Sequence, residues 1–130
     1  MRYLGIDYGR RRIGVAYSDE EGRIAFPDRV IAAGRDEAAI KEIVRLVSGA
    51  GAKEIVIGLP LGLDGKETEE SGRVRAFARS LGQAAQLPVH LENEILTSRM
   101  ATHVGVAKEM RDAASAAFIL QSYLDKENRS

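Results

Sequence analysis

A short stretch near the start of the chain combines residue types that could bind a metal ion and a phosphate group. Asp7 follows the apolar run 3–6, which is typical of a buried strand, and lies between Gly5 and Gly9. Three arginines follow: Arg10, Arg11 and Arg12. A carboxylate buried without a partner costs several kcal/mol, so Asp7 must be paired or face a cleft. The block indicates either a metal and phosphate site or a hairpin in which Asp7 caps the turn and the arginines are solvated.

Further acidic residues stand at the ends of later predicted elements. Glu92, Asn93 and Glu94 close a β-type run, and Asp112 opens the last predicted helix. If the first and fifth strands run in the same direction, their ends share the sheet edge at which α/β proteins bind ligands. Crowded carboxylates imply a bound cation or a proton, and Mg²⁺ or Mn²⁺ prefers oxygen ligands. It remains open whether Asp112 only complements the helix dipole and Glu94 is a solvated loop acid.

The composition sets limits on the class of protein. The 130 residues carry 19 acidic and 19 basic side chains, so any basic surface must be local. The absence of cysteine excludes disulfides, thiolate zinc sites and cysteine nucleophiles. There is no charged leader before a long apolar run and no stretch of about 18 apolar residues. We therefore expect a cytoplasmic protein without a membrane segment.

The remaining pattern predicts an α/β fold with a mixed five-stranded sheet, three antiparallel strands followed by alternating helix and strand, flanked by helices. The expected strands cover residues 3–7, 13–18, 24–31, 54–60 and 87–92. The first two expected helices run from Asp36 to the glycines at 49 and 51, and from the loop 61–67 to Gly82. The last follows an apolar stripe from Ala113 to Leu124. Residues 1–130 are expected to form a single domain. Tyr8 is expected to pack within it, although it could stack on a base.

Four ordered blocks of the sequence resemble the YqgF/RuvX family of Holliday junction resolvases and pre-16S rRNA nucleases. They are Gly-Ile-Asp-Tyr-Gly (5–9), Arg-Ile-Gly-Val-Ala (12–16), Val-Ile-Gly-Leu-Pro-Leu (56–61) and Asp-Ala-Ala-Ser-Ala-Ala (112–117). The resemblance covers nearly the whole chain. It implies an RNase H-like fold and a metal-dependent nuclease, a hydrolase that acts on structured nucleic acid.

The resemblance also implies roles for particular residues. Asp7, Glu94 and Asp112 correspond to catalytic acids that hold two Mg²⁺ (or Mn²⁺) ions. Six basic side chains would contact phosphates: Arg10, Arg11, Arg12, Lys66, Arg73 and Arg75. The implied substrate is the 5′ end of pre-16S rRNA in ribosome biogenesis, with the ribosomal small-subunit precursor as a partner, or a branched DNA junction. Whether the protein is a monomer or a homodimer stays open.

The third acidic block departs from the family pattern. The usual Asp-Glu-Arg-Leu is replaced by Asn93, Glu94, Ile95 and Leu96, and the segment 97–112 is shorter and less basic than usual. Asparagine adds no charge, so metal affinity falls if Asn93 is a ligand, and Ile95 lacks a guanidinium group. A catalytically weakened nucleic-acid-binding or ribosome-binding factor is therefore the alternative. A third interpretation, an actin-like kinase with a similar opening hairpin, needs two related domains.

Overall fold

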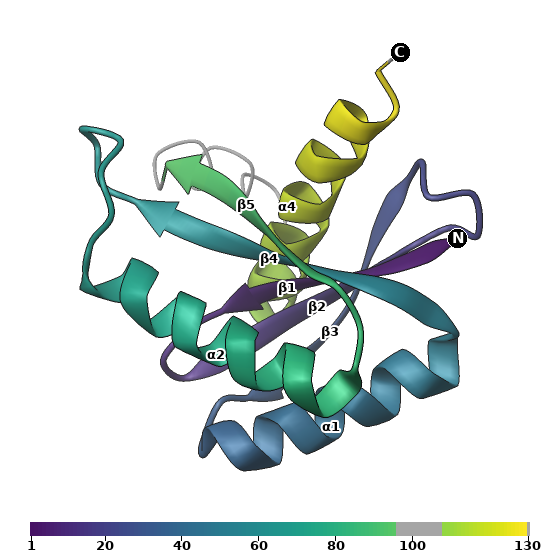
Figure 1. Cartoon of the computed structure of the whole chain (residues 1–130), viewed down its shortest axis with the longest axis horizontal. Coiled ribbons are helices and arrows are strands. Elements are labelled where there is room, and N and C mark those ends of the chain that lie inside the picture. Colours follow the sequence, from purple (N-terminus) through teal and green to yellow (C-terminus); the bar gives the residue numbers. More distant parts are fainter. Residues whose placement is uncertain (96–107, 130) are drawn as a thin grey trace.

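The structure, a computed structural model, describes residues 1–95 and 108–129 (Figure 1). Its strands are β1 (Arg2–Tyr8), β2 (Arg12–Ser18), β3 (Ala25–Ala32), β4 (Ala52–Leu61) and β5 (Val89–Ile95). Its helices are α1 (Asp36–Ala50), α2 (Glu69–Ala85) and α4 (Arg111–Glu127), the last preceded by a 3-10 turn, η1 (Lys108–Met110). The predicted order of strands and helices is confirmed.

The five strands form one mixed sheet in the order β3-β2-β1-β4-β5. The pairs β1–β2 and β2–β3 are antiparallel, whereas β1–β4 and β4–β5 are parallel. Because β1, β4 and β5 run in the same direction, their carboxyl ends lie at one edge of the sheet. This direction was the condition for Asp7 and the acids of β5 to share a site.

Helices cover both faces of this sheet. Figure 1 shows α1 and α2 together on one side and α4 on the other. Leu4 and Ile6 of β1 point into the core under α1 and α2, so the alternating residues Gly5 and Asp7 face α4. A Cβ on Gly5 would lie 2.8 Å from Leu120 Cβ of α4. The glycine therefore lets α4 lie directly on β1.

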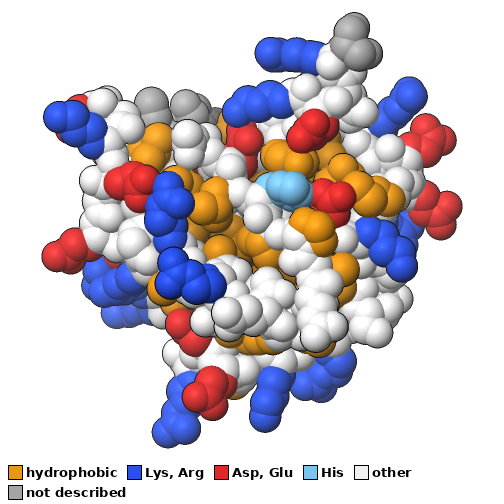
Figure 2. All heavy atoms as spheres, in the orientation of Figure 1, with side chains coloured by type: hydrophobic (Ala, Val, Ile, Leu, Met, Phe, Trp, Pro, Cys, Tyr) orange, Lys and Arg blue, Asp and Glu red, His pale blue; other side chains and the backbone are white. Residues whose placement is uncertain are grey.

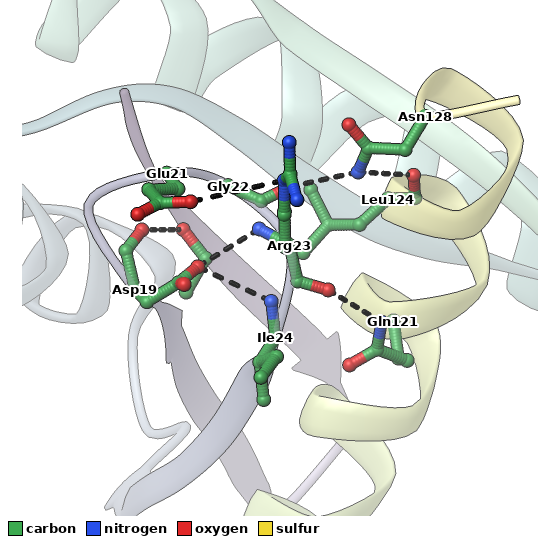
Figure 3. A network of polar contacts seen from close by, with 9 residues as sticks. Asp19, Glu21, Gly22, Arg23, Ile24, Gln121, Leu124 and Asn128 are labelled. Carbon is green, nitrogen blue, oxygen red and sulfur yellow. Dashed lines mark hydrogen bonds and ion pairs between the residues drawn. The ribbon is translucent and has the colours of Figure 1, made fainter. Parts of the chain in front are cut away.

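The carboxyl-terminal half of α4 is joined to the turn between β2 and β3 by polar contacts (Figure 3). The Gln121 side chain accepts a hydrogen bond from the Ala25 N–H at 2.9 Å and donates one to the Arg23 carbonyl at 2.8 Å. Asn128 Nδ2 donates to the Gly22 carbonyl at 3.0 Å. These contacts fix the helix at the end of the sheet remote from Asp7.

Helix α2 does not end at Gly82, as the glycine pattern predicted. It continues to Ala85, and Gln86 caps it in a left-handed conformation (φ 54°), with its N–H donating to the Gly82 carbonyl at 2.9 Å. A Cβ on Gly82 would lie 3.3 Å from Val89 Cγ2 of β5. The glycine therefore serves close packing of the helix on β5, and the prediction that it terminates α2 is wrong.

Strand β5 begins and ends later than the predicted range 87–92. Its parallel pairing with β4 extends from Val89 to Ile95, so the polar residues Glu92, Asn93 and Glu94 lie inside the strand. Backbone pairing with a buried neighbour outweighs their low intrinsic β propensity. Their side chains consequently alternate between the two faces of the sheet instead of extending from a loop.

Candidate active site

Asp7 lies at the last-but-one position of β1 and is 8% exposed. It faces α4 and forms part of the wall of a cavity of about 280 Å³ at the carboxyl end of the parallel strands. The turn after β1 is closed by its own backbone, since the Gly9 N–H donates to the Arg12 carbonyl at 3.0 Å. The buried Asp7 carboxylate therefore faces a cavity and not an exposed turn.

Glu94 lies on β5, separated from Asp7 on β1 by the intervening strand β4. It is 8% exposed, and a Cβ on Gly58 of β4 would lie 3.0 Å from Glu94 Oε2. Ile57 pairs with Ile6 in the β1–β4 ladder, so the next residues along, Gly58 and Asp7, lie side by side. The missing side chain of Gly58 thus leaves room for the Glu94 carboxylate, which lines a second cavity of about 400 Å³ that shares Leu61 with the cavity of Asp7.

Asn93 does not belong to this acidic face. It is exposed, and it lies beside Leu59, whose side chain belongs to the core under α2. Alternation along β5 puts the Asn93 side chain on the face opposite Glu92 and Glu94. The buried Glu92 carboxylate, in turn, is paired with Lys126 Nζ at 2.7 Å. The replacement of an acid by Asn93 therefore leaves the acidic pair unchanged.

Asp112 lies in the first turn of α4 and lines the same cavity as Asp7. The helix reaches β2 at Gly14, where a Cβ would lie only 1.8 Å from the Asp112 carbonyl oxygen. The Asp112 carboxylate points to the guanidinium group of Arg12, whose Nε donates to Asp112 Oδ2 at 2.8 Å. Asp112 thus lies at the site with its charge balanced by Arg12.

The oxygen donors at this edge are of the type that binds a hard divalent cation. As the side chains stand, no three acidic or histidine groups in residues 1–95 and 108–129 are arranged to hold an ion together. The carboxylates of Asp7 and Glu94 lie on the same face of the sheet, on either side of Gly58, and that of Asp112 is engaged by Arg12. The donor set fits Mg²⁺ or Mn²⁺ provided that Asp112 leaves Arg12 and turns into the cavity.

Glu70 is a further acidic residue of the cavity, which the sequence patterns did not indicate. It lies in the first turn of α2, lines the cavity and accepts a hydrogen bond from Arg10 Nε at 2.9 Å. The Thr68 N–H donates to Ser71 Oγ at 2.9 Å, and the Ser71 hydroxyl donates to the Pro60 carbonyl at 2.5 Å. The Thr-x-x-Ser spacing typical of a helix start was the signal that could have placed Glu70 at this edge.

The six basic residues expected to contact phosphate do not form an open basic patch. Four are ion-paired: Arg10 and Arg73 with Glu70, Arg12 with Asp112, and Arg75 with Glu67. The other two, Arg11 and Lys66, are exposed. Hydrogen bonds from Arg75 hold the pKa of the Glu67 carboxyl below its usual range. Figure 2 likewise shows basic and acidic side chains interspersed over the face it displays.

Tyr8 packs within the protein, as expected. Its ring lies on that of Phe77, with centroids 4.2 Å apart and an interplanar angle of 29°, and its hydroxyl donates to Asp36 Oδ1 at 2.8 Å. Burial and this hydrogen bond raise the pKa of Tyr8 to about 12. The expectations for the Ile95 side chain and for the segment 96–107 lie outside the described residues.

The structure shares its fold with solved structures of other proteins. The structure is similar to "T. thermophilus RuvC in complex with Holliday junction substrate" (TM-score 0.62, 12% identity, 100% of this chain and 98% of that one). It is also similar to the Fowlpox virus resolvase solved with Holliday junction DNA (TM-score 0.63, 10% identity, 99% and 100%). These likenesses show an RNase H-like fold, a fold family that generally depends on divalent metal ions.

Sequence comparison gives the family. The model described as "RuvX: Holliday junction resolvase" matches residues 1–126, and the chain belongs to this family. A relative from Chloroflexus aggregans named "Putative pre-16S rRNA nuclease" is 42% identical over 130 residues, covering 94% of this chain and 92% of the relative. The resemblance is confirmed, and family membership makes the chain a nuclease hydrolase. In the part of the chain that the structure describes, no helix is long and apolar enough to cross a membrane.

Proposed function

We propose that the chain hydrolyses phosphodiester bonds of structured RNA, and that its substrate is the 5′ end of pre-16S rRNA within the cytoplasmic precursor of the small ribosomal subunit. The name of the Chloroflexus aggregans relative supports the substrate, because the similarity extends over nearly the whole chain. The observation that carries the chemistry is the pair of buried carboxylates, Asp7 and Glu94, that lie on the same face of the sheet on either side of Gly58. Like charges at such a place are tolerated when a cation lies between them.

In this proposal Asp7, Glu94 and Asp112 are the catalytic acids and hold Mg²⁺ or Mn²⁺, two ions as in related nucleases. Such ions supply charge stabilisation at the phosphate and lower the pKa of bound water. The chain contributes rigid positions: Asp7 and Glu94 are fixed by pairing with neighbouring strands, and Asp112 by the contact of α4 with Gly14. These supports fix the backbone at the three acids before substrate binds, and the Asp112 side chain has only to turn from Arg12 into the cavity.

The basic residues bind substrate by exchanging partners. Arg12 is free to bind a phosphate once Asp112 turns into the cavity, and Arg10 can exchange Glu70 for a phosphate in the same way. Exposed ion pairs stabilise a protein by only about 0–1 kcal/mol, so these exchanges cost little. Arg11, Lys66, Arg73 and Arg75 would extend the phosphate contacts along the substrate.

The test is cleavage of a stem-loop RNA carrying the pre-16S 5′ end, in Mg²⁺ or Mn²⁺. Asp7→Asn is expected to abolish cleavage and to leave the melting temperature unchanged or higher, because it removes repulsion between buried carboxylates. Glu37→Gln, an exposed position on α1, is the matched control and should cleave like wild type. Asn93→Asp should also leave the rate unchanged, since position 93 faces away from the acids. Normal cleavage by Asp7→Asn would contradict the proposed site.

The Arg12–Asp112 pair favours a second candidate, a nucleic-acid-binding factor on the same fold with weak catalysis. In that case the pair persists when RNA is bound, and the third acid never turns into the cavity. RNA binding without cleavage by the wild-type protein, with either metal, would support this candidate. Cleavage of a four-way DNA junction in preference to the RNA would instead indicate a junction resolvase.

A further inference from the structure

The connection between β4 and α2 presents an apolar side chain to solvent. Leu63 is 78% exposed, whereas the other large apolar side chains that are exposed in the described residues, Met1, Ile24 and Phe26, are 52–53% exposed. A single exposed apolar residue is common on protein surfaces. What distinguishes Leu63 is the loop that holds it and the place where that loop lies.

Backbone and side-chain hydrogen bonds close the loop around Leu63. The Gly62 N–H donates to the Lys66 carbonyl at 2.9 Å, and the Gly65 N–H donates to the Gly62 carbonyl at 2.9 Å. The Lys66 N–H donates to Asp64 Oδ1 at 3.0 Å, and Gly65 adopts the positive φ of 78° that the turn requires. The loop therefore holds Leu63 outward in a defined conformation, and no ordering is needed when a partner binds.

The base of the loop is fixed beside the proposed active site. Leu61 and Glu67 form an antiparallel bridge, and Arg75 of α2 binds both carboxylate oxygens of Glu67 at 2.8 and 2.7 Å. Leu61 and Gly62 line the same cavity as Asp7. Figure 1 shows this connection extending beyond the carboxyl edge of the sheet. Leu63 therefore directly follows two residues that line the cavity a substrate phosphate would enter.

We infer that Leu63 inserts between neighbouring bases of the RNA next to the cleaved phosphate and unstacks them. Proteins that deform nucleic acids use leucine and similar apolar side chains as such wedges. The stacked base faces are the apolar surface that a nucleic acid offers close to a phosphate, and the exposed Lys66 on the same loop supplies a charge for the neighbouring backbone. The inference rests on the proposed function and adds a residue that positions the substrate.

The probe is the stem-loop RNA with 2-aminopurine, which becomes more fluorescent when unstacked, placed in turn at each position flanking the cleavage point of the wild-type protein. Asp7→Asn protein is used so that the RNA stays intact. Fluorescence should rise at a position next to that point. The rise should be lost in Asp7→Asn with Leu63→Ala and kept with Leu63→Phe, which preserves an apolar wedge.

In the cleaving protein, Leu63→Ala should lower kcat/KM about tenfold, as expected for losing the burial of a leucine side chain. Phe26→Ala, an exposed apolar position on the opposite edge strand β3, is the matched control and should change neither readout. If wild-type protein cleaves but no probe brightens, or if Leu63→Ala matches wild type, the wedge is excluded and the proposed function stands. If wild-type protein neither binds nor cleaves the RNA, both are overturned.

Discussion

Helix α4 is attached to the sheet by different kinds of contact at its two ends. At its carboxyl-terminal end, Gln121 and Asn128 make hydrogen bonds to backbone groups of the β2–β3 turn (Figure 3). At its amino-terminal end, Asp112 forms an ion pair with Arg12, and their side chains are 31% and 63% exposed. The hydrogen bonds of Gln121 and Asn128 join neutral side chains to backbone groups, and Lys126 Nζ adds a charged pair with Glu92 of β5 at 2.7 Å. Asp112, by contrast, lines the cavity, so both members of its pair with Arg12 can bind a ligand charge. We therefore expect the far end to fix the helix and the near end to exchange partners.

The near end is nevertheless held in place by packing. Because Gly14 has no side chain, α4 can pack closely on β2 at Asp112. Gly5 likewise lets Leu120 pack closely on β1. The position of the helix backbone therefore depends on glycines, and the direction of the Asp112 side chain depends on Arg12. These two contributions can be separated by substitution.

Gly14→Ala should have the largest effect. The added Cβ would lie 1.8 Å from the Asp112 carbonyl oxygen, a backbone atom that moves only if α4 moves. We expect the free energy of unfolding in urea to fall by about 3 kcal/mol, together with loss of cleavage. Gly49→Ala, in α1 with no atom within 4 Å of the new Cβ, is the control and should raise stability by about 0.5 kcal/mol. Wild-type stability of Gly14→Ala would contradict the close contact.

Gln121→Ala should have a smaller effect that is confined to stability. It removes the hydrogen bonds to Ala25 and Arg23, whose backbone groups can then bind water, so urea unfolding should show a loss of about 1 kcal/mol. Cleavage measured below the unfolding transition should be unchanged. Gln83→Ala, on the exposed face of α2, is the control and should leave both quantities close to wild type. Reduced kcat/KM in folded Gln121→Ala would show that the carboxyl-terminal end of α4 also affects catalysis at the proposed active site.

Arg12→Ala should have the opposite effect to Gln121→Ala: it should change ligand binding at the site and leave stability nearly unchanged. An exposed ion pair contributes only about 0–1 kcal/mol, so stability in the absence of metal should change little. Because Asp112 is released, the affinity for Mg²⁺ alone, measured by calorimetry, should rise severalfold, while RNA binding weakens.

The control for this experiment is Arg29→Ala, which breaks the Arg29–Asp28 pair on β3. That pair lies on the edge strand away from the cavity, so its loss should not alter Mg²⁺ affinity. Unchanged or lower Mg²⁺ affinity in Arg12→Ala would mean that Asp112 does not compete between the arginine and a metal.

The sequence was sufficient for the parts of the site that depend on local pattern. The apolar run before Asp7 predicted β1, and helical spacing placed Asp112 at the start of α4. The direction of the Asn93 side chain depends instead on the register of β5 against β4, where a shift of one residue exchanges the two faces. The Arg12–Asp112 pair joins residues 100 positions apart, and no local pattern encodes it. Gly82 resembled a helix terminator because its packing on Val89 is a tertiary contact.

Substitution of Asp19, in the turn between β2 and β3, should cause the smallest change in stability, and that change should depend on pH. Its Oδ1 accepts hydrogen bonds from the N–H groups of Arg23 and Ile24 at 2.8 and 3.2 Å, and these bonds hold its pKa below the usual 3.8. A carboxyl whose pKa is lowered by folding stabilises the protein above its unfolded pKa, and this contribution is lost as the pH falls through the folded pKa.

Asp19→Asn should therefore unfold at a slightly lower urea concentration than wild type at pH 7, and the difference should shrink as the pH falls below 3.8. Urea midpoints measured across this range, with Glu37→Gln as the control, give the comparison. A difference that stays constant with pH would show that the turn is held by the shape of the side chain and not by its charge. The turn that Gln121 and Asn128 contact would then not depend on the ionisation of Asp19, which would make its contrast with the Arg12–Asp112 end sharper.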